Sequence, residues 1–165
     1  MEDRILFEDN HLIVINKKAG ELVQGDKTGD TPLLESVKAF LKNKYNKQGA
    51  IYLGLVHRLD RPTSGVVLFA KSSKALVRLN NQFKLRTPKK TYWAIVSKNF
   101  KYKKGSLTHW MTRNTKQNKS KAHNTEVPNG KLAKLYFKKL KSFDNYCHLE
   151  VNLEKGRHHQ IRAQL

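Results

Sequence analysis

The stretch that most constrains the fold is residues 51–71, where two apolar runs flank a short polar centre. Each run has the length and the Ile, Val, Leu, Tyr and Phe content of a buried strand. Pro62, Ser64 and Gly65 in the centre favour turns. The pattern therefore predicts two core strands joined by a polar loop, and that loop carries one carboxylate, Asp60.

Asp60 differs from the charges around it. It is the only acidic residue between Glu35 and Glu126, and Arg58 and Arg61 flank it. Nearby cations favour the charged form of a carboxyl group, so we expect Asp60 to be ionised at neutral pH. An ionised aspartate on a loop in a basic groove can act as nucleophile or base toward a bound polyanion. These residues alone equally allow an aspartate that caps a turn or pairs with an arginine.

The charge balance of the chain indicates a polyanionic partner. Its 165 residues include 33 Lys+Arg and 13 Asp+Glu, a formal net charge of +20. The length suits one domain with a core, and 38% hydrophobic residues argue against a disordered basic tail. No apolar run reaches the roughly 18 residues that a membrane span needs, and no secretory signal pattern is present. The single cysteine, Cys147, fits a cytoplasmic protein.

Hydrophobic periodicity predicts the other elements. We expect one helix over residues 32–46, with Thr31 as its N-cap, and another from Ser72 or Ser73 to Phe83. Further strands are expected over residues 12–15, 90–96, 132–140 and 146–154. The predicted fold class is α+β, with a mixed, largely antiparallel sheet, two or three packed helices and an active cleft across the sheet.

Residues 98–121 combine many cations with aromatic rings and have no acid. Phe100, Tyr102 and Trp110 are interleaved with the cations, which are Lys98, Lys101, Lys103, Lys104, Arg113, Lys116, Lys119 and Lys121. Cations that hold phosphates and rings that stack on unpaired bases are the two components of RNA binding to single strands and loops. Thr112–Asn124 is polar, and we expect a mobile loop there. A solvated basic loop without an RNA contact is the alternative.

Three blocks of this sequence resemble the signatures of the RluA-type pseudouridine synthases, which make pseudouridine in ribosomal and transfer RNA. The first is His57-Arg-Leu-Asp-x-x-Thr-Ser-Gly65, followed by an apolar run and Ala-Lys. The second is Lys90-Thr-Tyr-Trp-Ala-Ile-Val96, similar to Lys-x-Tyr-x-Ala-x-Val. The third is Gly156-Arg-His-His-Gln-Ile-Arg-Ala-Gln-Leu165, similar to Gly-Arg-x-His-Gln-Ile-Arg-x-His/Gln-Leu.

The resemblance implies a set of site residues. Asp60 would act on a flipped-out uridine, Tyr92 would lie against its base, and Arg162 would pair with Asp60 as a planar, permanently charged guanidinium. Arg58 would support extrusion of the base from its stack. The residues expected to contact RNA are Arg58, Arg61, Lys89, Lys90, Lys103, Lys104, Arg113, Arg157 and Gln160.

The same resemblance implies an isomerase acting on ribosomal RNA ahead of transfer RNA. The reaction involves no redox change and no energy source, so we expect no small-molecule cofactor and no metal. His158 and His159 with Cys147 fit no zinc spacing. No membrane partner is expected, and the chain is expected to be a monomer.

Residues 1–165 are expected to form one catalytic domain, without a separate N-terminal RNA-binding domain. The family's catalytic domain usually continues past the third block, so we expect the C-terminal portion of this domain to be lacking. Two other functions remain open: a catalytically inactive basic RNA-binding module, and a basic structural protein of the ribosomal type.

The segment Asn16-Lys17-Lys18-Ala19-Gly20 closes the first predicted strand. The family usually has Lys-Pro-x-Gly here, so Lys18 stands where proline is common. This departure affects the stiffness of the loop more than its chemistry. The sequence leaves open whether Lys17 faces RNA, the carbonyl groups of a loop, or solvent.

Overall fold

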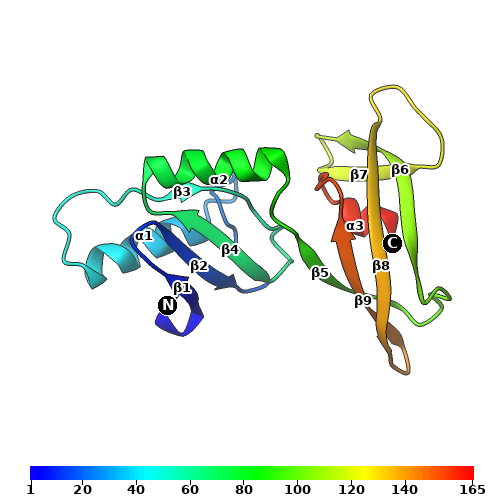
Figure 1. The fold of residues 1–165 in the computed structure, drawn as a ribbon, viewed down its shortest axis with the longest axis horizontal. Helices are drawn as coiled ribbons and strands as arrows, with labels where there is room; N and C mark the ends of the chain where they lie inside the picture. The colour runs from blue at the N-terminus through cyan, green and yellow to red at the C-terminus, as the bar shows by residue number, and fades with distance from the viewer. The chain divides into compact units, whose positions relative to one another are not determined.

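The computed structural model describes residues 1–165, which divide into two compact units, Met1–Pro88 and Lys89–Leu165 (Figure 1). We call them the N-terminal unit and the C-terminal unit. Strands and helices occur together in both, so the predicted α+β class is confirmed. All strand pairs are antiparallel, and they form two sheets, one in each unit. None of the helices has the length and apolar content needed to cross a membrane.

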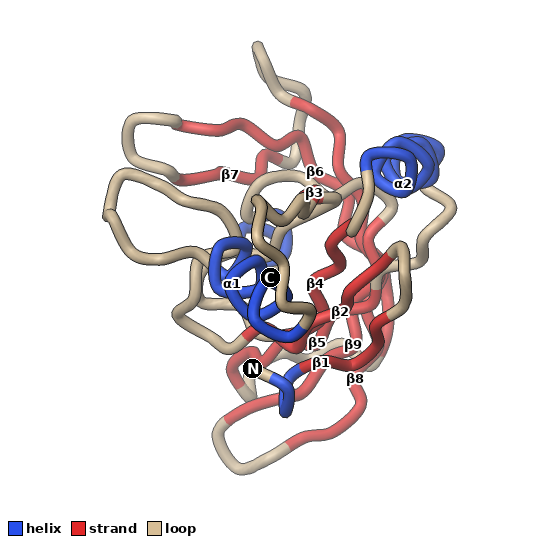
Figure 2. Tube along the Cα trace, turned by 90° about the vertical axis from the view of Figure 1, so that its left-hand side faces the viewer, coloured by secondary structure: helices blue, strands red, loops and turns tan.

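The N-terminal unit has a four-stranded sheet in the order β1-β2-β4-β3. Figure 2 shows β2 between β1 and β4. The strands are β1 (Ile5–Glu8), β2 (Leu12–Lys17), β3 (Gly54–Leu55) and β4 (Gly65–Ala70). A 3-10 turn, Glu2–Arg4, precedes them, and the helices are α1 (Leu33–Lys44) and α2 (Ser73–Leu85).

The core of this unit lies between α1 and one face of the sheet. Alternate residues of a strand share a face, and residues four apart share a face of a helix. The buried residues follow these two periods: Ile13 and Ile15 on β2, Val67 and Phe69 on β4, and Leu33, Val37 and Leu41 on α1. The sheet and α1 thus hold the two ends of the loop that contains Asp60.

The prediction that Thr31 caps α1 is wrong. The N-cap is Pro32, and no side chain caps the helix. The amides of Leu33 and Leu34 donate instead to the carbonyls of Leu22 and Val23, at 2.7 and 3.2 Å. Because these carbonyls satisfy amides that a cap would serve, the helix begins without a capping side chain.

The cap of α2 was predicted correctly as one of two serines. The hydroxyl of Ser72 accepts a hydrogen bond from the amide of Ala75 at 3.2 Å. The helix ends at Arg86, which has a left-handed backbone with φ +59°. Both ends of α2 are therefore defined by local contacts, as is usual for helix termini.

The C-terminal unit has a five-stranded sheet in the order β5-β9-β8-β6-β7. Its strands are β5 (Thr91–Ser97), β6 (Lys104–Asn114), β7 (Lys119–His123), β8 (Lys131–Ser142) and β9 (Tyr146–Leu153). The short helix α3 (Gln160–Gln164) follows. Ile161 and Leu165 pack on a core cluster formed by Leu135, Phe137, Cys147, Leu149 and Val151.

The mobile loop expected over Thr112–Asn124 is wrong. Most of this range lies in a hairpin in which β6 pairs with β7 from Trp110↔His123 to Asn114↔Lys119. Asn118, with φ +50°, forms part of the turn. The hairpin has polar residues on both faces, so it lacks the alternation of apolar and polar residues by which a strand is recognised in a sequence.

Glu8 joins β1 to α1 and to the end of β4 in a compact ionic cluster. Its carboxylate accepts hydrogen bonds from Lys44 at 2.8 Å, from Lys71 at 2.7 Å and from the hydroxyl of Tyr45 at 2.7 Å. The Glu8 side chain is only 9% exposed. Burial alone raises the pKa of Glu8, but the three hydrogen bonds outweigh it and lower the pKa from 4.5 to about 2.

We predict that Glu8→Gln destabilises the N-terminal unit at pH 7 by about 2 kcal/mol, because it removes the charge that pairs with Lys71. Because the pKa of Glu8 is lower in the folded than in the unfolded protein, its ionised carboxylate contributes stability that is complete above pH 4.5. This contribution is lost as the pH falls toward 2. The difference between the two proteins should therefore shrink from pH 4.5 toward pH 2.

Hydrogen exchange of the buried amides of β2 and β4 is the suitable measurement, because both tryptophans, Trp93 and Trp110, lie in the C-terminal unit. The matched control is Glu35→Gln, which breaks the exposed pair with Lys38 and should cost less than about 0.5 kcal/mol. Equal effects of the two substitutions at pH 7 would contradict the prediction.

Candidate functional site

Asp60 lies on the loop between β3 and β4, as the sequence predicted. The Asp60 side chain is half-buried, and its backbone carbonyl accepts a hydrogen bond from the Thr63 amide at 3.0 Å, which closes a turn. Gly65 begins β4 with φ +130°, a conformation that side chains disfavour. The loop therefore leaves and rejoins the sheet through a turn and a glycine.

Lys17, at the end of β2, lies beneath this loop. It is 0% exposed, and its ammonium group donates to the carbonyls of Lys18 (3.0 Å), Arg61 (3.1 Å) and Thr63 (2.6 Å). Burial lowers the pKa of Lys17, and the negative charges of Glu21 and Asp60 oppose that effect. Of the three environments that the sequence left open for Lys17, the structure selects the loop carbonyls.

Arg61 has structural contacts within the same unit. Its guanidinium donates to the carbonyl of Gly20 at 3.0 Å and to the carboxylate of Asp30 at 2.7 Å. Its own carbonyl accepts from the Gly20 amide at 2.8 Å. Arg61 therefore ties the Asp60 loop to the segment before α1. Both Arg61 and the other predicted RNA contact of this loop, Arg58, are exposed.

His57 has a role that sequence reasoning missed. β3 pairs with β4 only as far as Leu55↔Phe69, and the next free amide, that of Leu68, donates to Nε2 of His57 at 3.2 Å. The His57 ring also stacks on Phe83 of α2, with 5.2 Å between ring centroids. The His57 side chain thus satisfies an amide of β4 where the chain turns away toward Asp60.

Tyr92 lies on β5 in the C-terminal unit. With Ala94 and Val96 it packs against the core cluster, and it pairs in register with Val151. Trp93 and Ile95 alternate with these residues and are 75% and 63% exposed, so they lie on the other face of the sheet. The tyrosine of the second block is therefore half-buried on the face that α3 also covers.

Arg162 lies on α3 and is exposed. Two buried glutamines hold this helix on the sheet. Gln160, 2% exposed, donates to the carbonyl of Lys134 at 3.3 Å and accepts from the Arg157 amide at 3.0 Å. Gln164 donates to the carbonyl of Leu107 at 3.3 Å. The polar atoms of Gln160, predicted to contact RNA, thus serve the attachment of α3.

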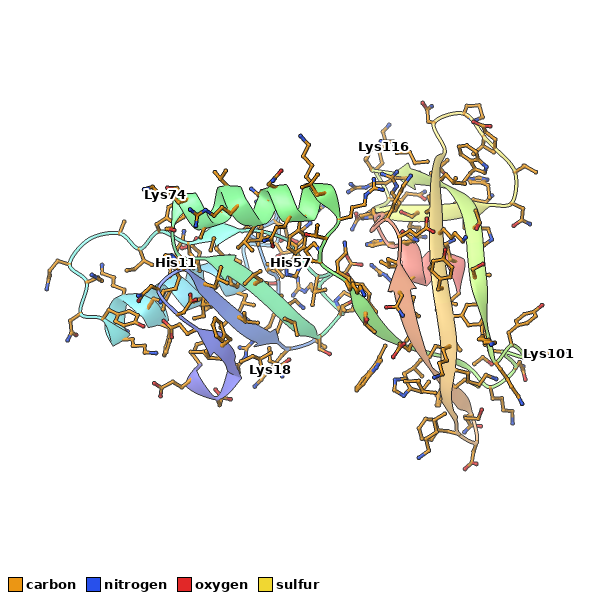
Figure 3. The ribbon with its side chains drawn as sticks, viewed as in Figure 1. His11, Lys18, His57, Lys74, Lys101 and Lys116 are labelled. Carbon is orange, nitrogen blue, oxygen red and sulfur yellow. The ribbon has the colours of Figure 1, made fainter.

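The remaining predicted RNA contacts are cations of the C-terminal unit. Lys89, Lys103, Lys104 and Arg113 are exposed, and Lys90 and Arg157 are half-buried. Lys116 and Lys101, labelled in Figure 3, lie toward opposite ends of the five-stranded sheet. Positive charge is therefore spread along the whole sheet, rather than gathered in one loop.

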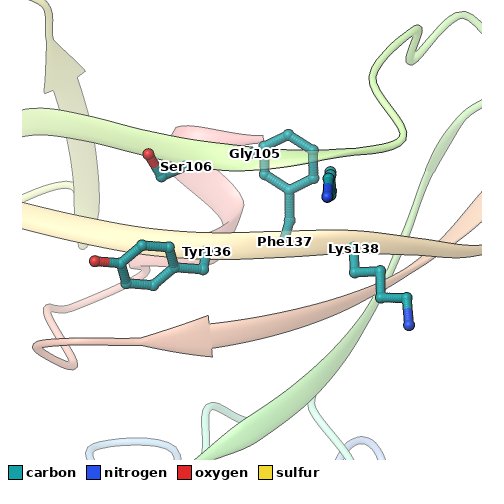
Figure 4. A pocket seen from close by; sticks show the side chains of 6 residues that line it. Gly105, Ser106, Tyr136, Phe137 and Lys138 are labelled. Atoms are coloured by element: carbon teal, nitrogen blue, oxygen red, sulfur yellow. The ribbon is translucent and has the colours of Figure 1, made fainter.

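A shallow hollow of about 530 Å³ lies on β6 and β8 (Figure 4). Two lysines and two aromatic rings are among its lining residues, which are Lys104, Gly105, Ser106, Tyr136, Phe137 and Lys138. A Cβ atom on Gly105 would lie 3.0 Å from the Phe137 ring, so the glycine leaves room for that ring. Phe137 belongs to the core, whereas the ring of Tyr136 is exposed, and lysines beside an exposed ring are suited to holding a phosphate next to a stacked base.

The structure thus groups the predicted site residues by unit. Asp60 belongs to the N-terminal unit, with Lys17 and His57 around its loop, and Tyr92 and Arg162 belong to the C-terminal unit. The pairing of Asp60 with Arg162 stays a prediction. No group of three or more His, Cys, Asp or Glu side chains could hold a metal ion.

Comparison with known proteins gives one consistent family. Residues 11–165 match the family model described as RNA pseudouridylate synthase. The chain is 38% identical over 168 residues to "Ribosomal large subunit pseudouridine synthase C" of Rickettsia prowazekii, covering 100% of this chain and 53% of that protein. It is 36% identical over 167 residues to "Uncharacterized RNA pseudouridine synthase YhcT" of Bacillus subtilis, covering 98% and 52%.

A solved structure has the same fold. "Human RNA Pseudouridylate Synthase Domain Containing 4" superposes with a TM-score of 0.81 at 24% identity, covering 98% of this chain and 63% of that one. The chain spans about half the length of the two curated relatives above.

We predict that Lys17→Met loosens the Asp60 loop, because it removes the ammonium donor from three carbonyls, of which that of Arg61 keeps the Gly20 amide as a second donor. The amides of Gly20 and Thr63, which both bond within this loop region, should exchange roughly 10- to 100-fold faster than in the parent protein. Lys18→Met, at an exposed side chain, is the control and should leave both rates unchanged. Unaltered exchange in Lys17→Met would show that the loop holds without the ammonium group.

Proposed function

Because the chain belongs to the RNA pseudouridylate synthase family, we propose that it isomerises specific uridines in RNA to pseudouridine, with Asp60 as the catalytic aspartate. The observation that carries this proposal is the family match over residues 11–165, which includes Asp60 on its braced turn. We further propose ribosomal RNA as the substrate, ahead of transfer RNA, because relatives are named ribosomal large subunit pseudouridine synthases.

The reaction moves one bond and conserves all atoms. The bond from the ribose C1′ to N1 of uracil breaks, the base turns, and a bond from C1′ to C5 forms. C5 loses its hydrogen as a proton and N1 gains one, so no electron acceptor takes part. An enzyme for this reaction must extrude the nucleotide, hold it while the base is detached, and place a carboxylate and a proton acceptor beside it.

The site residues divide these tasks in our proposal. Asp60 acts on the extruded nucleotide as nucleophile or base, and Arg162 pairs with it and keeps it ionised. Tyr92 stacks on the uracil and assists loss of the C5 proton. Arg58, exposed two residues before Asp60, fills the gap that the extruded base leaves in the RNA stack.

A second candidate is an RNA-binding module without catalysis. This candidate is supported by the exposed cations of the C-terminal unit and by the hollow beside Tyr136, which could bind RNA without Asp60. A turnover assay on this chain with uridine-containing RNA separates the two candidates. The RNA substrate in the cell is identified more directly by mapping pseudouridines in ribosomal and transfer RNA from cells with and without the gene.

We predict that Asp60→Asn abolishes isomerisation, with a loss of at least roughly 1000-fold, because an amide is neither nucleophile nor base. The measurement is tritium release from ribosomal and transfer RNA transcripts that carry 5-tritiated uridine. RNA affinity should change by less than about 3-fold, since cations supply most of it. Asp26→Asn, at an exposed turn aspartate, is the control. Normal turnover by Asp60→Asn would remove Asp60 from the mechanism.

We also predict that RNA affinity falls steeply with salt and that Lys103 and Lys104 contribute to this dependence. Each phosphate contact to single-stranded RNA adds about 0.7 to the slope of log affinity against log salt concentration. Replacing both lysines with alanine should reduce that slope by about 1.4. Replacing Lys42 and Lys47, exposed in the N-terminal unit, should leave the slope unchanged. Equal slopes for the two double variants would exclude these contacts.

A further inference from the structure

His158, just before α3, is hydrogen-bonded to the hairpin of β6 and β7. Its Nδ1 atom lies 2.8 Å from the hydroxyl of Ser120, and its Nε2 atom lies 3.0 Å from Oδ1 of Asn118. Asn118 is the left-handed residue of the hairpin turn, and Ser120 follows in β7. One ring thus holds two residues of the hairpin that are about 40 positions away in the sequence.

The chemistry of the partners makes this attachment independent of the charge on the ring. Oδ1 of Asn118 can only accept, so Nε2 of His158 carries a hydrogen and donates it. The hydroxyl of Ser120 donates to Nδ1 of a neutral ring and turns to accept from a protonated one. Both hydrogen bonds therefore persist whether or not His158 is protonated, so the ring stays attached to the hairpin in either state.

Along the chain, His158 is followed closely by the helix with Arg162. His159 follows with a left-handed backbone, φ +49°, and its ring stacks on that of His158 with 3.6 Å between centroids. The next residue, Gln160, is buried and bonded to the carbonyl of Lys134. Only His159 separates His158 from the first residue of α3, so a shift of the backbone at His158 is passed directly to the first turn of the helix.

The hairpin itself is strongly basic. Exposed cations line it on both sides of the turn: Arg113, Lys116, Lys119 and Lys121. There is no acidic residue between Asp60 and Glu126 to neutralise them. RNA phosphates that bind here would fix the position of the hairpin. The hydrogen bonds of Ser120 and Asn118 would then fix the position of His158.

We propose that His158 is a positioning residue that couples RNA binding on the β6–β7 hairpin to the placement of Arg162. The inference rests on the proposed function, because it gives Arg162 a task in catalysis. The third sequence block leaves position 158 open, so the family resemblance assigns this residue nothing. The substrate contact it serves is a phosphate backbone on the hairpin, and its effect on the reaction is exerted through α3.

The first test follows hydrogen exchange with and without a ribosomal RNA transcript. In the parent protein, RNA should slow exchange in the hairpin and also at the amides of Ala163 and Leu165, which report on α3. In His158→Ala, the slowing should remain in the hairpin and be lost in α3. If RNA slows α3 exchange equally in both proteins, the coupling does not run through His158. This test requires no turnover and stands even if the chain proves to be inactive.

The second test uses single-turnover rates of pseudouridine formation at saturating RNA. His158→Ala should lower this rate roughly 10-fold, because small misplacements of a reacting group are costly, while RNA affinity changes by less than about 3-fold. His158→Gln keeps one acceptor and one donor and should recover most of the rate. Asn118→Gly suits the left-handed turn, removes one of the two bonds, and should give an intermediate rate.

The control for both tests is Thr112→Val, which breaks the 2.9 Å bond between Thr112 and His123 inside the hairpin. It should leave the α3 exchange and the rate as in the parent protein. A purely structural role for His158 would lower rate and melting temperature together, without rescue by glutamine, and would overturn the proposal. Failure of the proposed function would be seen separately, as no pseudouridine formed by the parent protein.

Discussion

A buried ammonium group fixes the loop on which the candidate chemistry depends. Lys17 is excluded from solvent, and its ammonium group donates to the carbonyls of Arg61 and Thr63 in the turn that contains Asp60, and to that of Lys18. An ammonium in such a place is tolerated only when its hydrogen-bonding capacity is used. The same three hydrogen bonds therefore stabilise the buried ammonium group of Lys17 and hold the loop. A change in the position of one changes the position of the other.

The sequence predicts the strands and helices that have one apolar face. It predicts less well the side-chain partners and helix ends that depend on contacts with distant parts of the chain. The helix around Val37 and the strand with Tyr92 were found because their periods are regular. The partners of Lys17 were left open, because they lie 44 and 46 residues away along the chain. The Thr31 cap failed for the same reason, since carbonyls of a preceding loop satisfy the first amides of α1.

The β6–β7 hairpin shows a second limit of sequence reasoning. Lys119 and Lys121 point to one side of β7, while Ser120 and Ala122 point to the other. Since neither face is strongly apolar, the pattern resembles that of a polar loop. What holds the hairpin in place is pairing of β6 with β8, together with the contact of Ser120 to His158, and neither is visible before the chain is folded.

The two groups that the proposed reaction needs most are thus anchored by different means. Asp60 depends on backbone carbonyls that one charged side chain holds together, whereas Arg162 depends on Gln160 and His158, which are hydrogen-bonded to the sheet and the hairpin. A carboxylate on a short braced turn has little freedom to respond to RNA. A guanidinium on a five-residue helix tied to a basic hairpin can respond. RNA binding on the hairpin should therefore change the position of Arg162 more than that of Asp60.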